Sequence, residues 1–103
     1  EVPGTPFDEL RTLADVLRQR LGSGVVVVGA STDDRVSLVV AVTDDLTDRL
    51  DAGALARRMG SLVGGSGGGR ADFAQAGGKD PARLAGALAA VPAAVGDLLA
   101  GAR

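Results

Sequence analysis

The sequence contains no cysteine and no histidine. These absences exclude disulfide bonds, thiol nucleophiles, zinc sites built from cysteine and histidine, and a histidine general base. Tryptophan and tyrosine are also absent, and only two phenylalanines are present. The aromatic stacking platforms that are common in RNA-binding modules are therefore largely unavailable. Any recognition of RNA would rest on shape and on phosphate and ribose contacts.

The chain has 103 residues and a formal net charge of −2, so it gives no global attraction to nucleic acid. The region from Arg49 to Arg83, however, contains six basic residues and only three acidic ones, so it is locally positive. No apolar run approaches the roughly 20 residues of a membrane span, which predicts no membrane partner. The length predicts one domain over residues 1–103. Because the chain begins without an initiator methionine, we expect it to be an excised piece of a longer protein.

The patterning predicts an α/β fold, in which a small mixed sheet is flanked by helices in the order α-β-β-α-β-α. Helices are expected over 6–21, with Thr5 as N-cap, Pro6 at the first helical position and Gly22 as stop, and over 52–63, with Asp51 as N-cap. The apolar runs 25–28 and 36–42 predict a hairpin, with the first strand buried on both faces. A short edge strand is expected over 71–75, and Pro92 is expected to interrupt the last helix.

The most informative segment is 64–79, in which seven of sixteen residues are glycine. Glycine costs about 0.5–1 kcal/mol relative to alanine in regular structure, so repeated glycines indicate a need for bare backbone. One interpretation is an anion-binding nest of N–H groups in 64–69, with Arg70 supplying a guanidinium fork for phosphate. Lys79 and the N–H groups after Asp80 would form a second anion site. The other interpretation, a close-packed or flexible loop, stays open.

Several side chains in or near this segment allow two interpretations. Asp72 either pairs with Arg70 or is solvated, and Gln75 either binds a base or ribose or faces solvent. Phe73 is expected in the core. Arg57 and Arg58 are either phosphate contacts or part of a solvated helix face. The acidic cluster Asp44, Asp45 and Asp48 is better explained by turn chemistry than by a metal.

The segment GGSGGGRADFAQAGGKDP resembles the glycine-rich signature of the DHH-associated subdomain. In the form G-G-G-R-x-D-x-A-Q-A-G-G it is similar to the C-terminal globular domain of bacterial alanyl-tRNA synthetases. The run L-R-x-L-A-D-x-L-R at 10–18, the two valine-rich strands and D-A-G-x-L at 51–55 resemble the same family, so the likeness covers nearly the whole chain.

This resemblance implies a non-catalytic module that contacts the outer corner, or elbow, of tRNA-Ala and supports aminoacylation and editing by other domains of a cytoplasmic synthetase. ATP, magnesium and zinc would belong to those other domains, and the fragment itself would be a monomer without cofactors. The RNA-binding residues that it suggests are Gly65, Gly67, Gly68, Gly69, Arg70, Gln75, Gly77, Gly78 and Lys79, with Arg57 and Arg58 as possible additions.

Two departures from the family pattern bear on these expectations. A strand that usually precedes Glu1 and the dimer-forming helices are both outside the sequence, so one sheet position is expected to be short or empty. Two alternatives remain beside tRNA binding. One is the substrate-binding subdomain of a DHH-type phosphoesterase, although those enzymes have histidine where Arg70 stands. The other is a docking domain whose glycine-rich surface meets another protein.

Overall fold

The computed structural model describes residues 7–101. The predicted N-cap Thr5 and first helical residue Pro6 therefore lie outside the described residues. The helices are α1 (Phe7–Leu21), α2 (Ala52–Leu62), α3 (Leu84–Ala89) and α4 (Val91–Gly101), and two short 3-10 turns cover Asp44–Leu46 and Pro81–Arg83. The strands are β1 (Val25–Ser31), β2 (Val36–Val42), β3 (Ser66–Gly69) and β4 (Phe73–Gly78). They form one sheet in the order β1-β2-β4-β3.

The α/β class is confirmed and the predicted elements occur in the predicted order, but one further strand is present and the prediction of a mixed sheet is wrong. All three strand pairings of the described sheet are antiparallel. The difference arises in the glycine-rich segment, where Ser66–Gly69 forms strand β3 instead of a loop. The connection from β3 to β4 is too short for a crossover, so it permits only a hairpin. Strand β4 consequently lies inside the sheet, where the sequence predicted an edge strand.

Strand β1 also differs from its prediction. Its run Val25–Val28 is only half-buried, because β1 is a terminal strand of the sheet. The fully buried strand is β2, in which Leu38 through Val42 are all inaccessible. The predicted hairpin between the two is confirmed, with Val25 opposite Val42 and Ser31 opposite Val36. The sheet is thus organised around β2.

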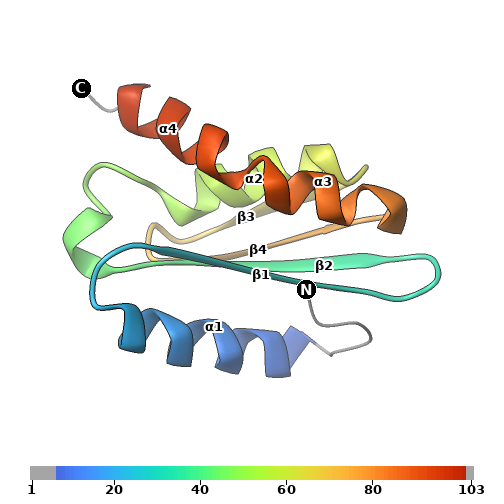
Figure 1. The fold of residues 1–103 in the computed structure, drawn as a ribbon, viewed down its shortest axis with the longest axis horizontal. Helices are drawn as coiled ribbons and strands as arrows, with labels where there is room; N and C mark the ends of the chain where they lie inside the picture. Colours follow the sequence, from blue (N-terminus) through green and yellow to red (C-terminus); the bar gives the residue numbers. More distant parts are fainter. Residues whose placement is uncertain (1–6, 102–103) are drawn as a thin grey trace.

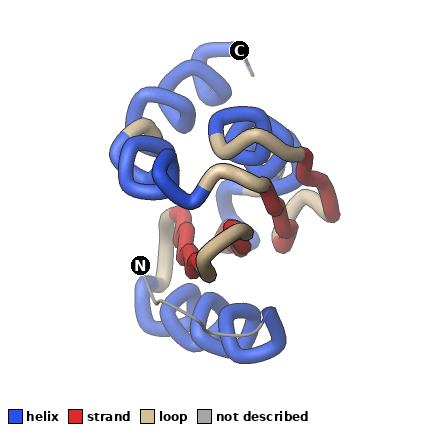
Figure 2. Tube along the Cα trace, turned by 90° about the vertical axis from the view of Figure 1, so that its right-hand side faces the viewer, coloured by secondary structure: helices blue, strands red, loops and turns tan. Residues whose placement is uncertain are grey.

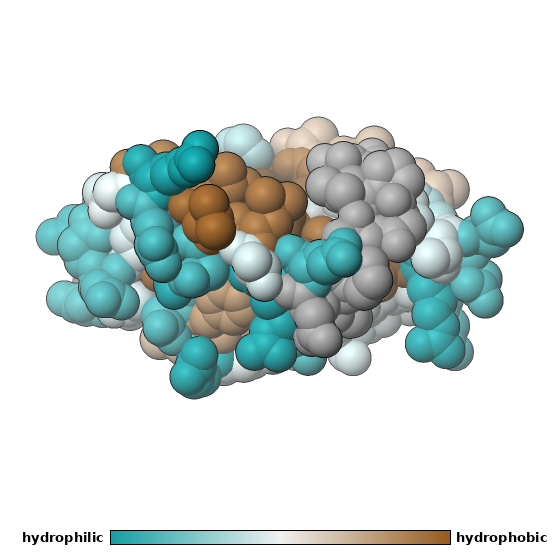
Figure 3. All heavy atoms as spheres, turned by 90° about the horizontal axis from the view of Figure 1, so that it is seen from below, coloured by the Kyte–Doolittle hydropathy of each residue, from teal (hydrophilic) through white to brown (hydrophobic). Residues whose placement is uncertain are grey.

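Helices cover both faces of the sheet, with α1 on one side and α2, α3 and α4 on the other (Figures 1 and 2). Leu10 and Ala14 of α1 pack with Val39 and Ala41 in the smaller core, and a larger core fills the space between the sheet and the other helices. Other apolar side chains of α1 stay accessible, namely Val16, Leu17 and Leu21. These apolar side chains gather on the surface seen from the α1 side (Figure 3).

The predicted helix boundaries follow local chemistry. The Asp51 carboxylate accepts a hydrogen bond from the Gly53 N–H at 2.8 Å and caps α2, as predicted. Gly22 has φ 78° and ends α1, as predicted. Around Pro92 the segments Pro81–Ala89 and Val91–Leu99 meet at 53°. No single described helix has the length and apolar character to cross a membrane, although this bent pair satisfies both criteria together.

Asp45 links the turn after α1 to the turn after β2. Its carboxylate accepts hydrogen bonds from the hydroxyls of Ser23 and Thr43, and the Thr43 hydroxyl accepts one from the Gly24 N–H at 3.0 Å. These bonds, the one from Ser23 above all, hold the pKa of Asp45 below its usual 3.8.

We therefore expect replacement of Asp45 by asparagine to change how stability depends on pH. Because the pKa is lower in the folded state, the carboxylate's contribution is complete above 3.8 and is lost as pH falls through the folded value. The difference in urea midpoint between wild type and Asp45→Asn should be larger at neutral pH than at about pH 3. Equal differences at the two pH values would contradict this assignment.

Candidate nucleic-acid interface

The candidate site is the part of the sheet's α1 side that lies on β3 and β4. Residues that oppose one another in adjacent strands share a face, so Gly68, Gln75 and Val39 form one row. Val39 belongs to the core under α1, which places the whole row on the α1 side. Helix α1 packs chiefly on β1 and β2, and on β3 and β4 it leaves Ser66 and Gln75 exposed and Gly68 and Gly77 partly exposed. We call this surface, made by Ser66, Gly68, Gln75 and Gly77, the open face.

The glycines of segment 64–79 fall into two groups, those at crowded positions and those at open ones. A Cβ on Gly67 would lie 2.3 Å from the Ala56 carbonyl oxygen, and one on Gly65 would lie 1.9 Å from the Gly77 carbonyl oxygen. Gly69 and Gly78 are crowded in the same way, by Ala74 and by the Val63 backbone. These four positions allow backbone segments to approach closely, which supports the close-packed interpretation of the sequence.

Gly68 is the exception among the strand glycines. A Cβ there would meet no atom within 4 Å, and its φ is not in the left-handed region. On Gly77 the nearest atom to a Cβ would be the Val36 carbonyl oxygen, at 3.3 Å. Neither folding geometry nor crowding accounts for glycine at position 68. The bare backbone there leaves room for a ligand on the open face.

One end of the open face is a cleft of about 310 Å³ beside the hairpin between β3 and β4. Arg70 stands at its rim with a side chain that is 77% exposed. The Arg70 guanidinium lies 3.7 Å from the Asp72 carboxylate, so of the two interpretations of Asp72 the structure shows the pairing, as a long and exposed contact. The lining residues are Arg11, Gly68, Gly69, Arg70, Phe73, Ala74 and Gln75.

Phe73 forms the inner wall of this cleft. It is half-buried and packs against the core under α1, as the sequence predicted. The guanidinium groups of Arg11 and Arg18 lie 5.8 Å and 5.4 Å from the centre of its ring. Within these cation–π contacts the ring is covered by the two arginines. The phenylalanine therefore positions charge at the cleft and is not itself a stacking platform.

Arg18 holds the tip of the hairpin. Its guanidinium donates to the Asp72 carbonyl oxygen at 3.0 Å and pairs with the Asp15 carboxylate at 2.6 Å. The backbone of Arg70 is fixed as well, because its N–H donates to the Phe73 carbonyl and its carbonyl accepts from the Gly53 N–H. The exposed Arg70 side chain thus extends from a rigid backbone.

The other end of the open face is a second cleft, of about 330 Å³. Lys79 and Arg35 supply its positive charge, and Ser37 of β2 and glycines 64, 65, 77 and 78 line it. The strand register brings Arg35 and Lys79 to the same cleft, because Val36 lies opposite Gly78 and the two basic residues stand beside these strand ends. Both ends of the open face are therefore basic.

One detail of the predicted anion chemistry is wrong. Residues 66–69 are extended strand, so they do not form the nest that was expected in 64–69. The charge around residues 66–69 comes from side chains and not from converging backbone N–H groups. After Asp80 a 3-10 turn leads directly into α3, and the Asp80 carboxylate pairs with Arg83 at 2.9 Å. The second anion site, at Lys79 and the N–H groups after Asp80, stays a prediction.

Arg57 and Arg58 are exposed, but they belong to α2, on the opposite side of the sheet from the open face. Arg58 pairs with Asp97 of α4 at 2.7 Å. The solvated-face interpretation is the more natural one for Arg58. Among the described residues, no group of three or more acidic side chains is arranged to hold a metal ion, and the Asp45 carboxylate bonds within the turns described above.

The sequence analysis missed Arg11, Arg18 and Arg35. Arg11 and Arg18 are seven residues apart, which places them on one stripe of a helix, and this spacing was a usable signal. Arg35 directly precedes a strand, but its proximity to Lys79 depends on the strand register. That register could not be read from a sheet whose third strand was taken for a loop.

Comparison with known proteins identifies the family of the chain. Residues 1–97 match the family model of the DHHA1 domain. The chain therefore belongs to the DHHA1 domain family. The particular type that it matches is the C-Ala domain of alanyl-tRNA synthetase. The crystal structure of that domain from Aquifex aeolicus superposes with a TM-score of 0.85 at 35% identity, covering 91% of this chain and 85% of that one.

The chain is also similar to one part of several alanine–tRNA ligases. The chain is 55% identical over 92 residues to an alanine–tRNA ligase of Chromohalobacter salexigens, and 62% identical over 79 residues to one of Anaeromyxobacter dehalogenans. These matches cover 89% and 77% of this chain. The chain accounts for only 11% and 9% of the length of those ligases.

Proposed function

We propose that this chain is the tRNA-binding C-terminal domain of an alanine–tRNA ligase, and that it binds tRNA-Ala through the open face. The observation that carries the proposal is the bare, uncrowded Gly68 between two basic clefts. The absence of a side chain at Gly68, in the middle of the open face, permits a nucleic acid to approach the main chain there, and cations at both ends of the face favour its phosphates. The similarity to alanine–tRNA ligases supports the choice of tRNA as the ligand.

The finer parts of the proposal rest on the family resemblance. The domain contacts the elbow of tRNA-Ala and so helps to present the acceptor end to the aminoacylation and editing sites. It does no chemistry by itself, and ATP, magnesium and zinc act in other domains of the cytoplasmic parent enzyme. The partners are tRNA-Ala and those other domains, and the isolated chain is a monomer.

Replacement of Arg70 by alanine tests this function. A charge-assisted hydrogen bond contributes about 1.5–3 kcal/mol, so the dissociation constant for tRNA-Ala should rise about tenfold or more. The slope of log affinity against log salt concentration should fall by about one. Binding is measured by titration of labelled tRNA-Ala at several salt concentrations.

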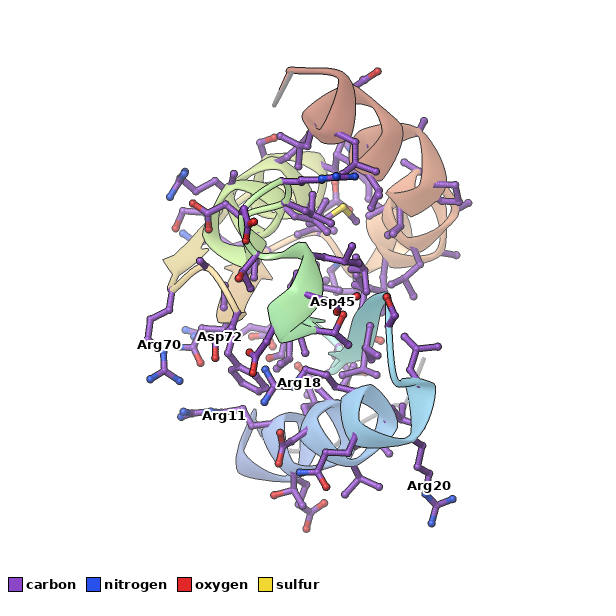
Figure 4. All side chains as sticks on the ribbon, turned by 90° about the vertical axis from the view of Figure 1, so that its left-hand side faces the viewer. Arg11, Arg18, Arg20, Asp45, Arg70 and Asp72 are labelled. Carbon is purple, nitrogen blue, oxygen red and sulfur yellow. The ribbon has the colours of Figure 1, made fainter. Side chains whose placement is uncertain are left out.

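The matched control is Arg20→Ala, because Arg20 is exposed on α1 and points away from the open face (Figure 4). It should leave affinity nearly unchanged apart from a small long-range charge effect. Equal losses in the two variants would indicate a diffuse charge effect and contradict a site at the open face. Loss of binding to a neighbouring protein domain, with tRNA affinity intact, would favour the docking alternative.

A further inference from the structure

We propose that Arg11 of α1 and Arg70 of the hairpin bind one phosphodiester group of the RNA together, above a floor made by Gly68 and Gly69. This inference rests on the proposed function and names the ligand group at one end of the open face. It adds a residue from α1 to a site otherwise built from the glycine-rich segment.

The fold brings the two arginines together from distant parts of the chain. Both line the 310 Å³ cleft, Arg11 from the α1 side and Arg70 from the hairpin side. In Figure 4 their side chains extend toward the same side of the molecule. A group held in this cleft would be within reach of both guanidinium groups.

Among residues 7–101, neither of these two arginines makes a short ion pair. Within the described part of the chain, Arg11 has no ion pair, and its recorded contact is the cation–π contact with Phe73. Arg70 has only a long, exposed contact of 3.7 Å with Asp72. The Arg18 guanidinium, in contrast, is hydrogen-bonded to the Asp15 carboxylate and to the Asp72 carbonyl. Arg18 is therefore a positioning residue, and the guanidinium groups of Arg11 and Arg70 are available to a ligand.

The chemistry of the cleft favours a phosphodiester. A guanidinium offers paired N–H donors that match the oxygens of a phosphate. Two guanidinium groups fit around one phosphate better than they fit around one carboxylate. The floor has no side chain at positions 68 and 69, so a nucleotide backbone can lie against it. The Gln75 amide, exposed in the same row as Gly68, can bond a ribose hydroxyl beside the phosphate.

The test is a double-substitution cycle with tRNA-Ala as the probe, using Arg11→Met, Arg70→Met and the double variant. Methionine keeps an aliphatic stem against Phe73 while it removes the charge. If both arginines hold one phosphate, each single substitution should weaken binding about tenfold. The double variant should then weaken binding about thirtyfold, which is clearly less than the product of the two single effects. Its slope of log affinity against log salt concentration should be lower than that of the wild type by about one.

Thermal unfolding of each variant checks that the fold is intact, and Arg20→Met is the control for loss of charge on α1. Independent effects, with a product of about a hundredfold and a slope lowered by about two, would overturn the shared phosphate. If only Arg70→Met weakens binding, Arg11 is outside the interface and the inference fails while the proposed function stands. If the wild-type chain does not bind tRNA-Ala, both fail.

Discussion

Replacing Gly67 by alanine is expected to destabilise the domain by about 3 kcal/mol, the upper end of what overpacking usually costs. The new Cβ would lie 2.3 Å from the Ala56 carbonyl oxygen and 2.6 Å from its carbon. Both are backbone atoms of α2, so no side chain can turn away to make room. Helix α2 would have to move off β3. For a domain of this size, the melting temperature should fall by more than about 10 °C.

The matched control is the neighbouring residue. At Gly68 a Cβ would touch nothing within 4 Å, so Gly68→Ala should change stability by less than about 0.5 kcal/mol. Thermal and urea unfolding of the two variants measures the contrast directly. If both alanines are tolerated equally, the close approach of α2 to β3 is not what requires glycine at position 67.

The second large effect is expected on binding and not on stability. Replacing Gly68 by leucine should leave the fold intact, because the new side chain points into the open space on the α1 side of β3. It would cover the bare backbone between the two basic clefts and keep a nucleic acid from lying against it. We expect tRNA-Ala to bind about tenfold or more weakly, a change of about 1.4 kcal/mol or more.

A control variant separates this effect from added bulk in general. Gly96 of α4 is equally uncrowded, and α4 lies on the other side of the sheet (Figure 1). Gly96→Leu should therefore bind tRNA-Ala like the wild type. Titrations of both variants, after confirmation of their melting temperatures, make the comparison. Unchanged affinity for Gly68→Leu would place the RNA elsewhere on the molecule.

Much of the fold could be predicted from the sequence, because local signals dominate there. The Asp51 cap, the stop at Gly22 and the break near Pro92 each depend on a few neighbouring residues, and the structure shows all three. Strand β3 could not be predicted in this way. Its sequence Ser-Gly-Gly-Gly has poor strand propensity, and it becomes a strand because it pairs with β4 and supports α2.

The sequence predicted the central segment of the candidate site but not the structural role of each glycine in it. The sequence showed that bare backbone was needed over 64–79, yet it could not separate crowded from open glycines. That distinction depends on the tertiary approach of α2, which crowds Gly67 and spares Gly68. The cations at the rims come partly from α1 and from the start of β2, so their place in the site depends on the assembled sheet. The RNA contacts themselves stay a prediction.

The most direct measurement is to map the amide resonances of the isotopically labelled chain while unlabelled tRNA-Ala is added. We predict that the largest shifts fall on the open face and its rims, at Ser66, Gly68, Gln75, Gly77 and the backbone of Arg11 and Arg70. Residues on the outer side of α4 should change little. Shifts confined to α2 and α4, with the open face unperturbed, would contradict the proposal that this glycine-rich surface binds tRNA.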